Sequence, residues 1–208
     1  FNIIIFEKPV SNNLQTAKKI FDYCKKKKIT VLVNYLRRFD KSTLNLKKIL
    51  NSEKIGAIKE IKVIYKKGFI NSCSHYINYL DFFFNLNKKI KIIKTSNFTK
   101  DDFHVNFVIS HGYDIIFEYS KNKFIDEKIL IIGSFGKVEY LTEKGHIKVT
   151  KNNKKEILKN NYDKPFKSVY NNVCDVLSSK SYPKSTIKDS LKTLEIMNLV
   201  LKKIRNKF

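Results

Sequence analysis

The sequence predicts an α/β segment that forms the edge of a doubly wound parallel sheet, followed by an α+β domain with a mostly antiparallel, open-faced sheet and helices on one side. Three observations indicate this. A short apolar strand, an amphipathic helix and a second apolar strand come first. Strictly alternating apolar residues follow in the middle, and a helix with near-regular apolar spacing comes last. We place the first domain at residues 1–36 and the second at residues 37–208.

The first domain is predicted from its apolar pattern. The strand that precedes Glu7 is followed by a helix over residues 12–28, in which apolar residues recur at three- and four-residue steps. Ser11 and Asn12 offer N-cap oxygens for this helix. The run Ile29 to Val33 is apolar throughout, which is typical of a parallel strand covered on both faces. This β-α-β order is typical of the later part of a doubly wound nucleotide-binding fold.

The second domain is predicted element by element. Helices are expected over residues 41–50, 72–84, 166–177 and 187–204, and strands over 58–65, 90–98, 103–110, 113–119 and within 128–149. The strands at 103–110 and 113–119 alternate strictly and predict an antiparallel hairpin with one buried face. The Lys/Asn-rich residues 151–155 are interpreted as a turn.

Composition bounds the class of protein. The chain has 208 residues, of which 42% are hydrophobic and 16 are phenylalanine, which is enough for a substantial core. No apolar run approaches the ~20 residues that a membrane-spanning helix needs. Cys24, Cys73 and Cys174 are widely separated and show no metal or disulfide spacing. We expect a cytoplasmic protein without a membrane partner or a metal site.

The net charge of +23 carries less information than its size suggests. Only Arg37, Arg38 and Arg205 are arginines, so almost all of the positive charge is lysine. Arginine is the residue that recognises phosphates and bases with two hydrogen bonds. The sequence therefore predicts weak, salt-sensitive affinity for polyanions and no specific nucleic-acid partner.

Five segments, in order, carry a resemblance to a known family. They are Glu7-Lys8-Pro9 at the end of a strand, the turn at 54–58, the helix start at 71–78, the turn at 131–136, and residues 182–201. Together they resemble the glucose–fructose oxidoreductase / inositol dehydrogenase (Gfo/Idh/MocA) family over essentially the whole chain. The resemblance implies an NAD(P)-dependent oxidoreductase that acts on a sugar, cyclitol or sugar nucleotide, with NAD or NADP as cofactor.

The resemblance also implies roles for single residues. Lys8 and His75 would be catalytic. The cofactor-binding residues would be Glu7, Lys8, Pro9, Tyr35 and Arg38, and the substrate-binding residues would be Lys8, Arg37, Asn71, His75 and Asn78. A histidine with a pKa near ~6.5 suits the removal of a hydroxyl proton during hydride transfer, whereas a lysine near ~10.4 needs desolvation or neighbouring cations.

Each of these residues has a structural alternative. Lys8 could be an ordinary solvated lysine, and His75 could be a hydrogen-bonded histidine among aromatic residues. Arg37 and Arg38 could pair with Asp22, Glu53 or Asp40. The sequence also departs from the family pattern, since Asn71 and Asn78 stand where the family has aspartates and Cys73 where it has a glycine. Asparagine forms hydrogen bonds but takes up no proton.

No glycine precedes Gly56, and the chain contains no G-x-G motif. The glycine-rich turn that holds the pyrophosphate in nucleotide-binding domains is therefore not among these residues. The chain begins with Phe1, and we expect an N-terminally truncated oxidoreductase that is inactive alone. The alternatives are a non-catalytic oligomerisation or sugar-binding remnant and, with less support, a polyanion-binding domain.

The open face of the predicted sheet gives an expectation about assembly. A sheet with helices on one side leaves its other face without cover, and Ile115, Phe117 or their neighbours would need a partner there. We therefore expect a homo-oligomer, such as a dimer, formed through this face.

Overall fold

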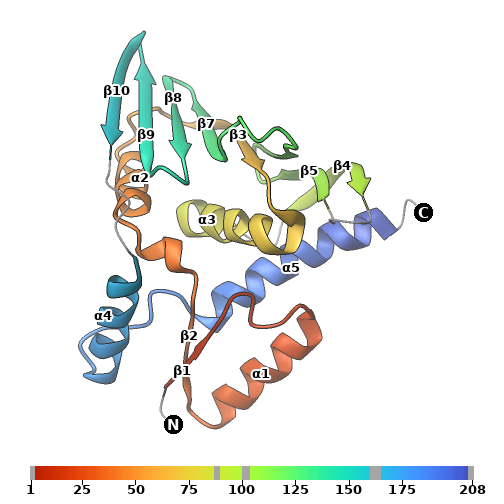
Figure 1. The fold of residues 1–208 in the computed structure, drawn as a ribbon, viewed down its shortest axis with the longest axis vertical. Coiled ribbons are helices and arrows are strands. Elements are labelled where there is room, and N and C mark those ends of the chain that lie inside the picture. The colour runs from red at the N-terminus through yellow and green to blue at the C-terminus, as the bar shows by residue number, and fades with distance from the viewer. Residues whose placement is uncertain (1–2, 87–89, 100–103, 160–164, 206–208) are drawn as a thin grey trace.

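The computed structural model describes residues 3–86, 90–99, 104–159 and 165–205. Its described part contains a two-stranded sheet, an eight-stranded sheet and five α-helices (Figure 1). The strands are β1 (Ile3–Phe6), β2 (Thr30–Val33), β3 (Ile58–Tyr65), β4 (Lys91–Thr99), β5 (His104–Ser110), β6 (Asp114–Tyr119), β7 (Lys128–Gly133), β8 (Gly136–Leu141), β9 (His146–Lys151) and β10 (Lys154–Lys159). The helices are α1 (Leu14–Lys26), α2 (Lys41–Asn51), α3 (Ser74–Phe84), α4 (Pro165–Leu177) and α5 (Ile187–Arg205), with a 3₁₀ turn η1 (Leu36–Phe39) and a π-helical turn η2 (Gly68–Cys73).

The small sheet confirms the predicted β-α-β order. β1 and β2 pair in parallel, from Ile3 opposite Thr30 to Phe6 opposite Val33, and α1 connects them. One prediction is wrong in detail, because the N-cap of α1 is Asn13, whose side-chain oxygen accepts from the backbone N–H of Thr16. The C-terminal part of the chain returns to this sheet: the backbone N–H of Val33 donates to the carbonyl of Ser185, just before α5.

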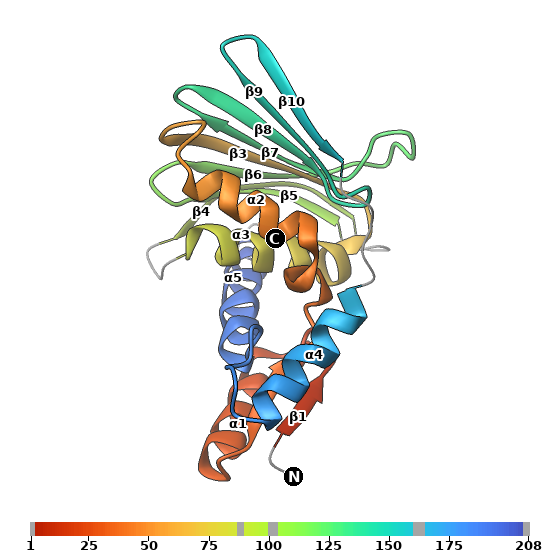
Figure 2. The same ribbon diagram turned by 90° about the vertical axis from the view of Figure 1, so that its left-hand side faces the viewer.

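The large sheet has the order β10-β9-β8-β7-β3-β6-β5-β4, and every neighbouring pair except β3–β6 is antiparallel. The prediction of a mostly antiparallel sheet is confirmed, with one parallel pair at its centre. Helices α2, α3 and α5 lie on one side, and no described helix covers the other face (Figure 2). No helix among the described residues combines the length and the apolar character needed to cross a lipid bilayer.

Strict alternation divides the side chains of β5 and β6 between two faces, one of which meets the helices. Phe107 and Phe117 pair across β5 and β6, stack with ring centroids 4.3 Å apart, and are buried on the helix side. Ile115 is equally buried. Of the alternatives named for the open face, Ile115 and Phe117 therefore do not lie there, and their neighbours Ile116 and Glu118 occupy it. A one-residue change in register exchanges the two faces of a strand, so the face could not be assigned from alternation alone.

The hairpin of residues 103–119 is otherwise confirmed, although Phe103 lies outside the described residues. The turn predicted within residues 151–155 is confirmed, whereas the strand that follows it is not among the predictions. A two-residue turn joins β9 to β10, which pairs antiparallel with β9 at the sheet edge. The side chains of β10 are almost all exposed, so its sequence carries no buried-face alternation that could have predicted it.

The turn between β7 and β8 packs against the turn that follows α2. A methyl group on Gly133 would lie 2.1 Å from the backbone oxygen of Ile55, and one on Gly56, whose φ is +73°, would lie 2.2 Å from Ser134 Oγ. Two of the segments that carried the family resemblance are thus in contact, and both need glycine for steric reasons.

Candidate functional site

The candidate site lies at the carboxyl ends of the two parallel strands. The backbone N–H of Asn34, just after β2, donates to the carbonyl of Phe6, the last residue of β1. The side-chain amide of Asn34 donates to Glu7 Oε1 at 2.6 Å. These two bonds fix where the chain leaves both strands, so that Lys8 begins the connection to α1 and Tyr35 begins the connection toward the large sheet. In α/β sheets this edge is the usual place for ligands.

Lys8 reaches from this edge to η2, the turn that leads into α3 beside the large sheet. Its side-chain Nζ donates to the backbone oxygen of Asn71, which lies in η2 just before α3, at 3.0 Å. Lys8 is half-buried, whereas Glu7 and Asn71 are exposed. Pro9 follows through a cis peptide bond and lines a hollow of about 50 Å³ against α5. That hollow is far smaller than a substrate pocket. The solvent-facing surface around Lys8 is therefore the candidate place for a substrate.

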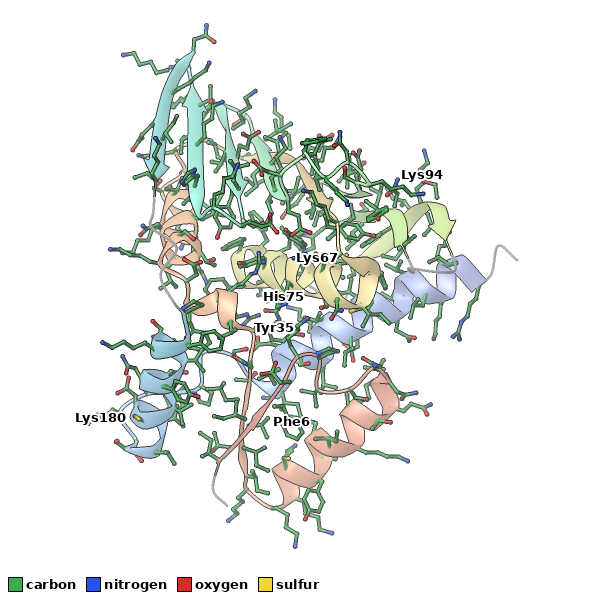
Figure 3. The ribbon with its side chains drawn as sticks, viewed as in Figure 1. Phe6, Tyr35, Lys67, His75, Lys94 and Lys180 are labelled. Carbon is green, nitrogen blue, oxygen red and sulfur yellow. The ribbon has the colours of Figure 1, made fainter. Side chains whose placement is uncertain are left out.

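His75 lies in the first turn of α3 and faces the small sheet. Its imidazole meets the ring of Tyr35 edge-on, with the ring centroids 6.1 Å apart. Figure 3 shows the two side chains together, between α3 and the strand that ends at Phe6. His75 is half-buried and Tyr35 is fully buried. The structure therefore brings four predicted residues together between the small sheet and the start of α3. We call this place the junction; its residues are Lys8, Tyr35, Asn71 and His75.

The electrostatics of this junction favour a neutral imidazole. Burial, together with the smaller effects of the charges of Lys8 and Arg37, lowers the pKa of His75 to about 3. Burial also lowers the pKa of Lys8; the charge of Arg37 acts in the same direction and that of Glu7 opposes it. Lys8, Arg37 and His75 thus act on one another although they come from three different segments.

We expect the neutral imidazole to make stability depend on pH. The folded state binds a proton at His75 more weakly than the unfolded state, so stability is intact above about pH 6.5 and is lost as the pH falls toward 3. At about pH 4 the loss from this one group reaches at most about 3 kcal/mol. Urea unfolding at several pH values should show a smaller loss between about pH 7 and 4 in His75→Gln than in the parent. Equal losses in both proteins would contradict the buried, neutral state.

Two further predicted residues lie inside the protein. Arg38 Nε donates to the side-chain oxygen of Asn78 at 2.7 Å, and its Nη1 lies 3.1 Å from a carboxylate oxygen of Asp189. Arg38 and Asn78 are both buried, and the guanidinium also lies over the ring of Phe82. Arg38 therefore ties η1 to α3 and α5. The alternative that it pairs with Asp22, Glu53 or Asp40 is wrong. Direct contact of Arg38 with a cofactor and of Asn78 with a substrate stays a prediction, and the buried geometry does not favour it.

Sequence reasoning missed one carboxylate that positions the site. Glu127, just before β7, is buried and accepts hydrogen bonds from the backbone N–H of Lys66, the hydroxyl of Ser72 and the hydroxyl of Tyr76. Ser72 and Tyr76 flank His75 along the chain. Glu127 therefore holds the start of α3 in place, although it lies more than fifty residues away in the sequence. No local pattern around Glu127 predicts this contact.

The comparisons with known proteins come from structure alone. No family model matches the chain, and no curated protein matches it by sequence. An oxidoreductase from Agrobacterium radiobacter, solved in complex with NAD+, L-tartaric acid and magnesium, superposes with a TM-score of 0.80 at 16% identity, covering 98% of this chain and 71% of that chain. The chain has the fold of an oxidoreductase. An oxidoreductase from Sinorhizobium meliloti gives the same TM-score at 14% identity, covering 98% of this chain and 70% of that one.

Identities this low establish the shared fold and leave the chemistry to the residues of this chain. The shared fold spans both the small and the large sheet, because 98% of the chain is covered. The junction that holds Lys8 and His75 is thus part of the architecture that these oxidoreductases share.

Proposed function

We propose that the chain is the substrate-binding part of an NAD(P)-dependent oxidoreductase of the Gfo/Idh/MocA type, acting on a hydroxyl of a sugar, cyclitol or sugar nucleotide. The observation that carries this proposal is the meeting of Lys8, from the carboxyl end of β1, with the segment that begins α3 and bears His75. A cation and an imidazole at the edge of a parallel sheet are the groups that oxidation of a carbinol requires. In this account, β1, α1 and β2 are one edge of a nucleotide-binding domain.

The residues at this edge fit the nicotinamide end of the cofactor. Glu7 and Asn34 present polar groups where the two parallel strands end, and half-buried Lys8 stands beside them. No glycine precedes Gly56, so the pyrophosphate would be held by other parts of a complete nucleotide-binding domain. When bound, the cofactor supplies the hydride acceptor. Glu7 and Lys8 would border its nicotinamide, and Pro9 would direct the chain away from it. Tyr35 is buried, so its predicted place beside the cofactor would be indirect, through the ring contact with His75.

The proposed chemistry divides between two side chains. Oxidation of a carbinol removes a hydride from carbon and a proton from oxygen, and His75 would accept that proton once ligand binding raises the pKa of its imidazole from about 3 toward the working pH, because a general base is most effective near that pH. Lys8 would donate a hydrogen bond to the same oxygen and would orient it toward the imidazole. Arg37 and Asn71 would contact more distant polar groups of the substrate. Tyr35 would keep the imidazole in place through the edge-on ring contact.

A second copy of the chain is the proposed partner at the open face of the large sheet. This face carries the ion pairs Lys62–Glu118 and Lys128–Glu139 among apolar side chains such as Ile116 and Leu130. A pattern of paired charges and apolar residues suits a self-complementary dimer contact. Sedimentation at micromolar concentration tests this proposal, since a dimer supports it and a monomer contradicts it.

Binding of nicotinamide mononucleotide tests the function on the chain itself. We expect this half-cofactor to shift the NMR resonances of His75 and Tyr35, whereas adenosine monophosphate leaves both unchanged, because only the nicotinamide end reaches the junction. Lys8→Ala should weaken the response, and the exposed α1 variant Lys19→Ala should not. Shifts of equal size with both nucleotides, or none with either, would contradict the proposed nicotinamide site.

A further inference from the structure

We infer that a hollow beside the β9–β10 hairpin is an anion site, and that its ligand is a small compound with two or more linked phosphate groups. The hollow has a volume of about 390 Å³. We call it the lysine hollow, because its lining includes Lys54, Lys151, Lys154 and Lys155, together with Val149 and Glu156. The proposed oxidoreductase chemistry uses none of these residues.

The lysine hollow lies on the helix side of the large sheet, at the β9–β10 turn, which is at the top of Figure 1. Val149 is a buried core residue of β9, and Lys151 follows it on the same face of the strand. Glu156 and Lys154 lie opposite these two residues on β10. Lys54 comes from the chain after α2, and its Nζ lies 3.3 Å from a carboxylate oxygen of Glu156. Val149 therefore contributes an apolar surface, and residues from two separate segments bring the charges.

This end of the sheet lies away from the junction. The β7–β8 and β9–β10 turns share it, since Gly136 at the start of β8 lies opposite Lys151. β3 begins at the same end, and η2, which leads to His75, follows the other end of β3. A ligand in the lysine hollow would therefore leave the junction free for a substrate.

The charge of the lining is unbalanced. It contains four lysines and one carboxylate, that of Glu156, which is in the ion pair with Lys54. No described carboxylate is in an ion pair with Lys151, Lys154 or Lys155. Lys151 and Lys154 also lie directly opposite each other on β9 and β10, where like charges destabilise a strand pair. An anion bound between them would replace this repulsion with two attractions.

The residue types of the lining indicate the class of ligand. Lysine binds phosphate as a point charge on a flexible stem, whereas bidentate recognition of a planar group is the property of arginine. Several lysines around one hollow therefore suit a ligand that carries several negative charges close together. The volume of about 390 Å³ lies within the roughly 300–1,000 Å³ of small-molecule pockets. A compound with linked phosphates meets both conditions.

Protection of the sheet edge explains only part of this arrangement. Lysines on an edge strand prevent pairing with other chains, and β10 is an edge strand. Lys54 lies outside the strands, so edge protection gives no reason for its place at the hollow.

Titration with inorganic triphosphate tests the inference, with orthophosphate and a thymidine tetranucleotide as comparison ligands. At about 150 mM NaCl, which screens long-range attraction, triphosphate should bind about tenfold more tightly than orthophosphate. It should shift the amide NMR signals of Val149 and Asn152 and leave that of His75 unchanged. The tetranucleotide should bind more weakly than triphosphate, because sugars separate its phosphates.

Two double variants of equal net charge separate the lysine hollow from general attraction to a chain with a net charge of +23. Lys151→Gln combined with Lys154→Gln should weaken triphosphate binding about tenfold or more. Lys19→Gln combined with Lys25→Gln removes two exposed charges from α1 and should change the affinity by less than about twofold.

Lys54→Gln gives a second test outside the strands, and the amide NMR spectrum of each variant checks its folding. This change should also weaken triphosphate binding, since it removes a cation and leaves the carboxylate of Glu156 without its partner. Three results would overturn the inference: equal losses in the two double variants, equal affinity for triphosphate and orthophosphate, or tighter binding of the tetranucleotide than of triphosphate.

Discussion

Arg38→Ala is expected to lower the free energy of unfolding by about 3–5 kcal/mol, the largest effect that we predict for a single side chain. The guanidinium is 5% exposed, bonds the side chain of Asn78 at 2.7 Å and pairs with Asp189 at 3.1 Å. Its removal leaves the buried amide of Asn78 without a donor and the carboxylate of Asp189 without its cation. Unpaired buried groups retain their full desolvation cost, whereas the intact network offsets it.

The measurement is urea unfolding followed by circular dichroism, with Arg205→Ala as the matched control. Arg205 is an exposed arginine in the last turn of α5, and its removal should change stability by less than about 0.5 kcal/mol. Arg38→Lys should recover only part of the loss, because an ammonium cannot bond Asn78 and Asp189 with the planar geometry of a guanidinium. A loss below about 1 kcal/mol in Arg38→Ala would show that this network does not join η1, α3 and α5.

His75→Ala is expected to lower the turnover of the NAD(P)-dependent oxidation by about 10²–10⁴-fold, with little change in stability at neutral pH. The imidazole is the proposed acceptor of the hydroxyl proton, and its loss leaves that proton to water. The assay for the proposed function is the rate of NAD(P)H formation from NAD(P)+ and a polyol.

Tyr35→Phe is the matched control for this prediction. It keeps the ring that packs against His75 and should retain most of the turnover. Turnover of His75→Ala within about threefold of the parent, for every substrate that the parent oxidises, would remove His75 from the mechanism.

Local pattern predicted most elements of the fold. The apolar spacing of α5, the alternation of β5 and β6, and the apolar run of β2 each depend on which faces of an element are buried, and that information is present in the residues of the element itself. Three of the five segments that carried the family resemblance, at residues 7–9, 54–58 and 131–136, lie at a strand end or at tight turns. Lys8 and His75, from two of the five segments, lie at one junction, and their catalytic roles stay a prediction.

Contacts between distant segments were not predictable in this way. Nothing around Glu127 indicates that it bonds Ser72 and Tyr76, and nothing around Arg38 distinguishes Asp189 from the nearer Asp40 as its partner. The side of the sheet on which Ile115 lies could not be predicted, because alternation divides the side chains between two faces without saying which face meets the helices. These features depend on contacts between segments that are distant in the sequence, and each segment holds only one of the two partners of such a contact.

The pairing of Lys8 with His75 across the junction is the central claim, and the NMR titration of His75 in the parent and in Lys8→Met tests it most directly. The account predicts that the imidazole in the parent titrates far below 6.5, and that removal of the Lys8 charge raises its pKa. Lys19→Met should leave the titration unchanged. A histidine that titrates near 6.5 in the parent, with the same pKa in Lys8→Met, would contradict the account.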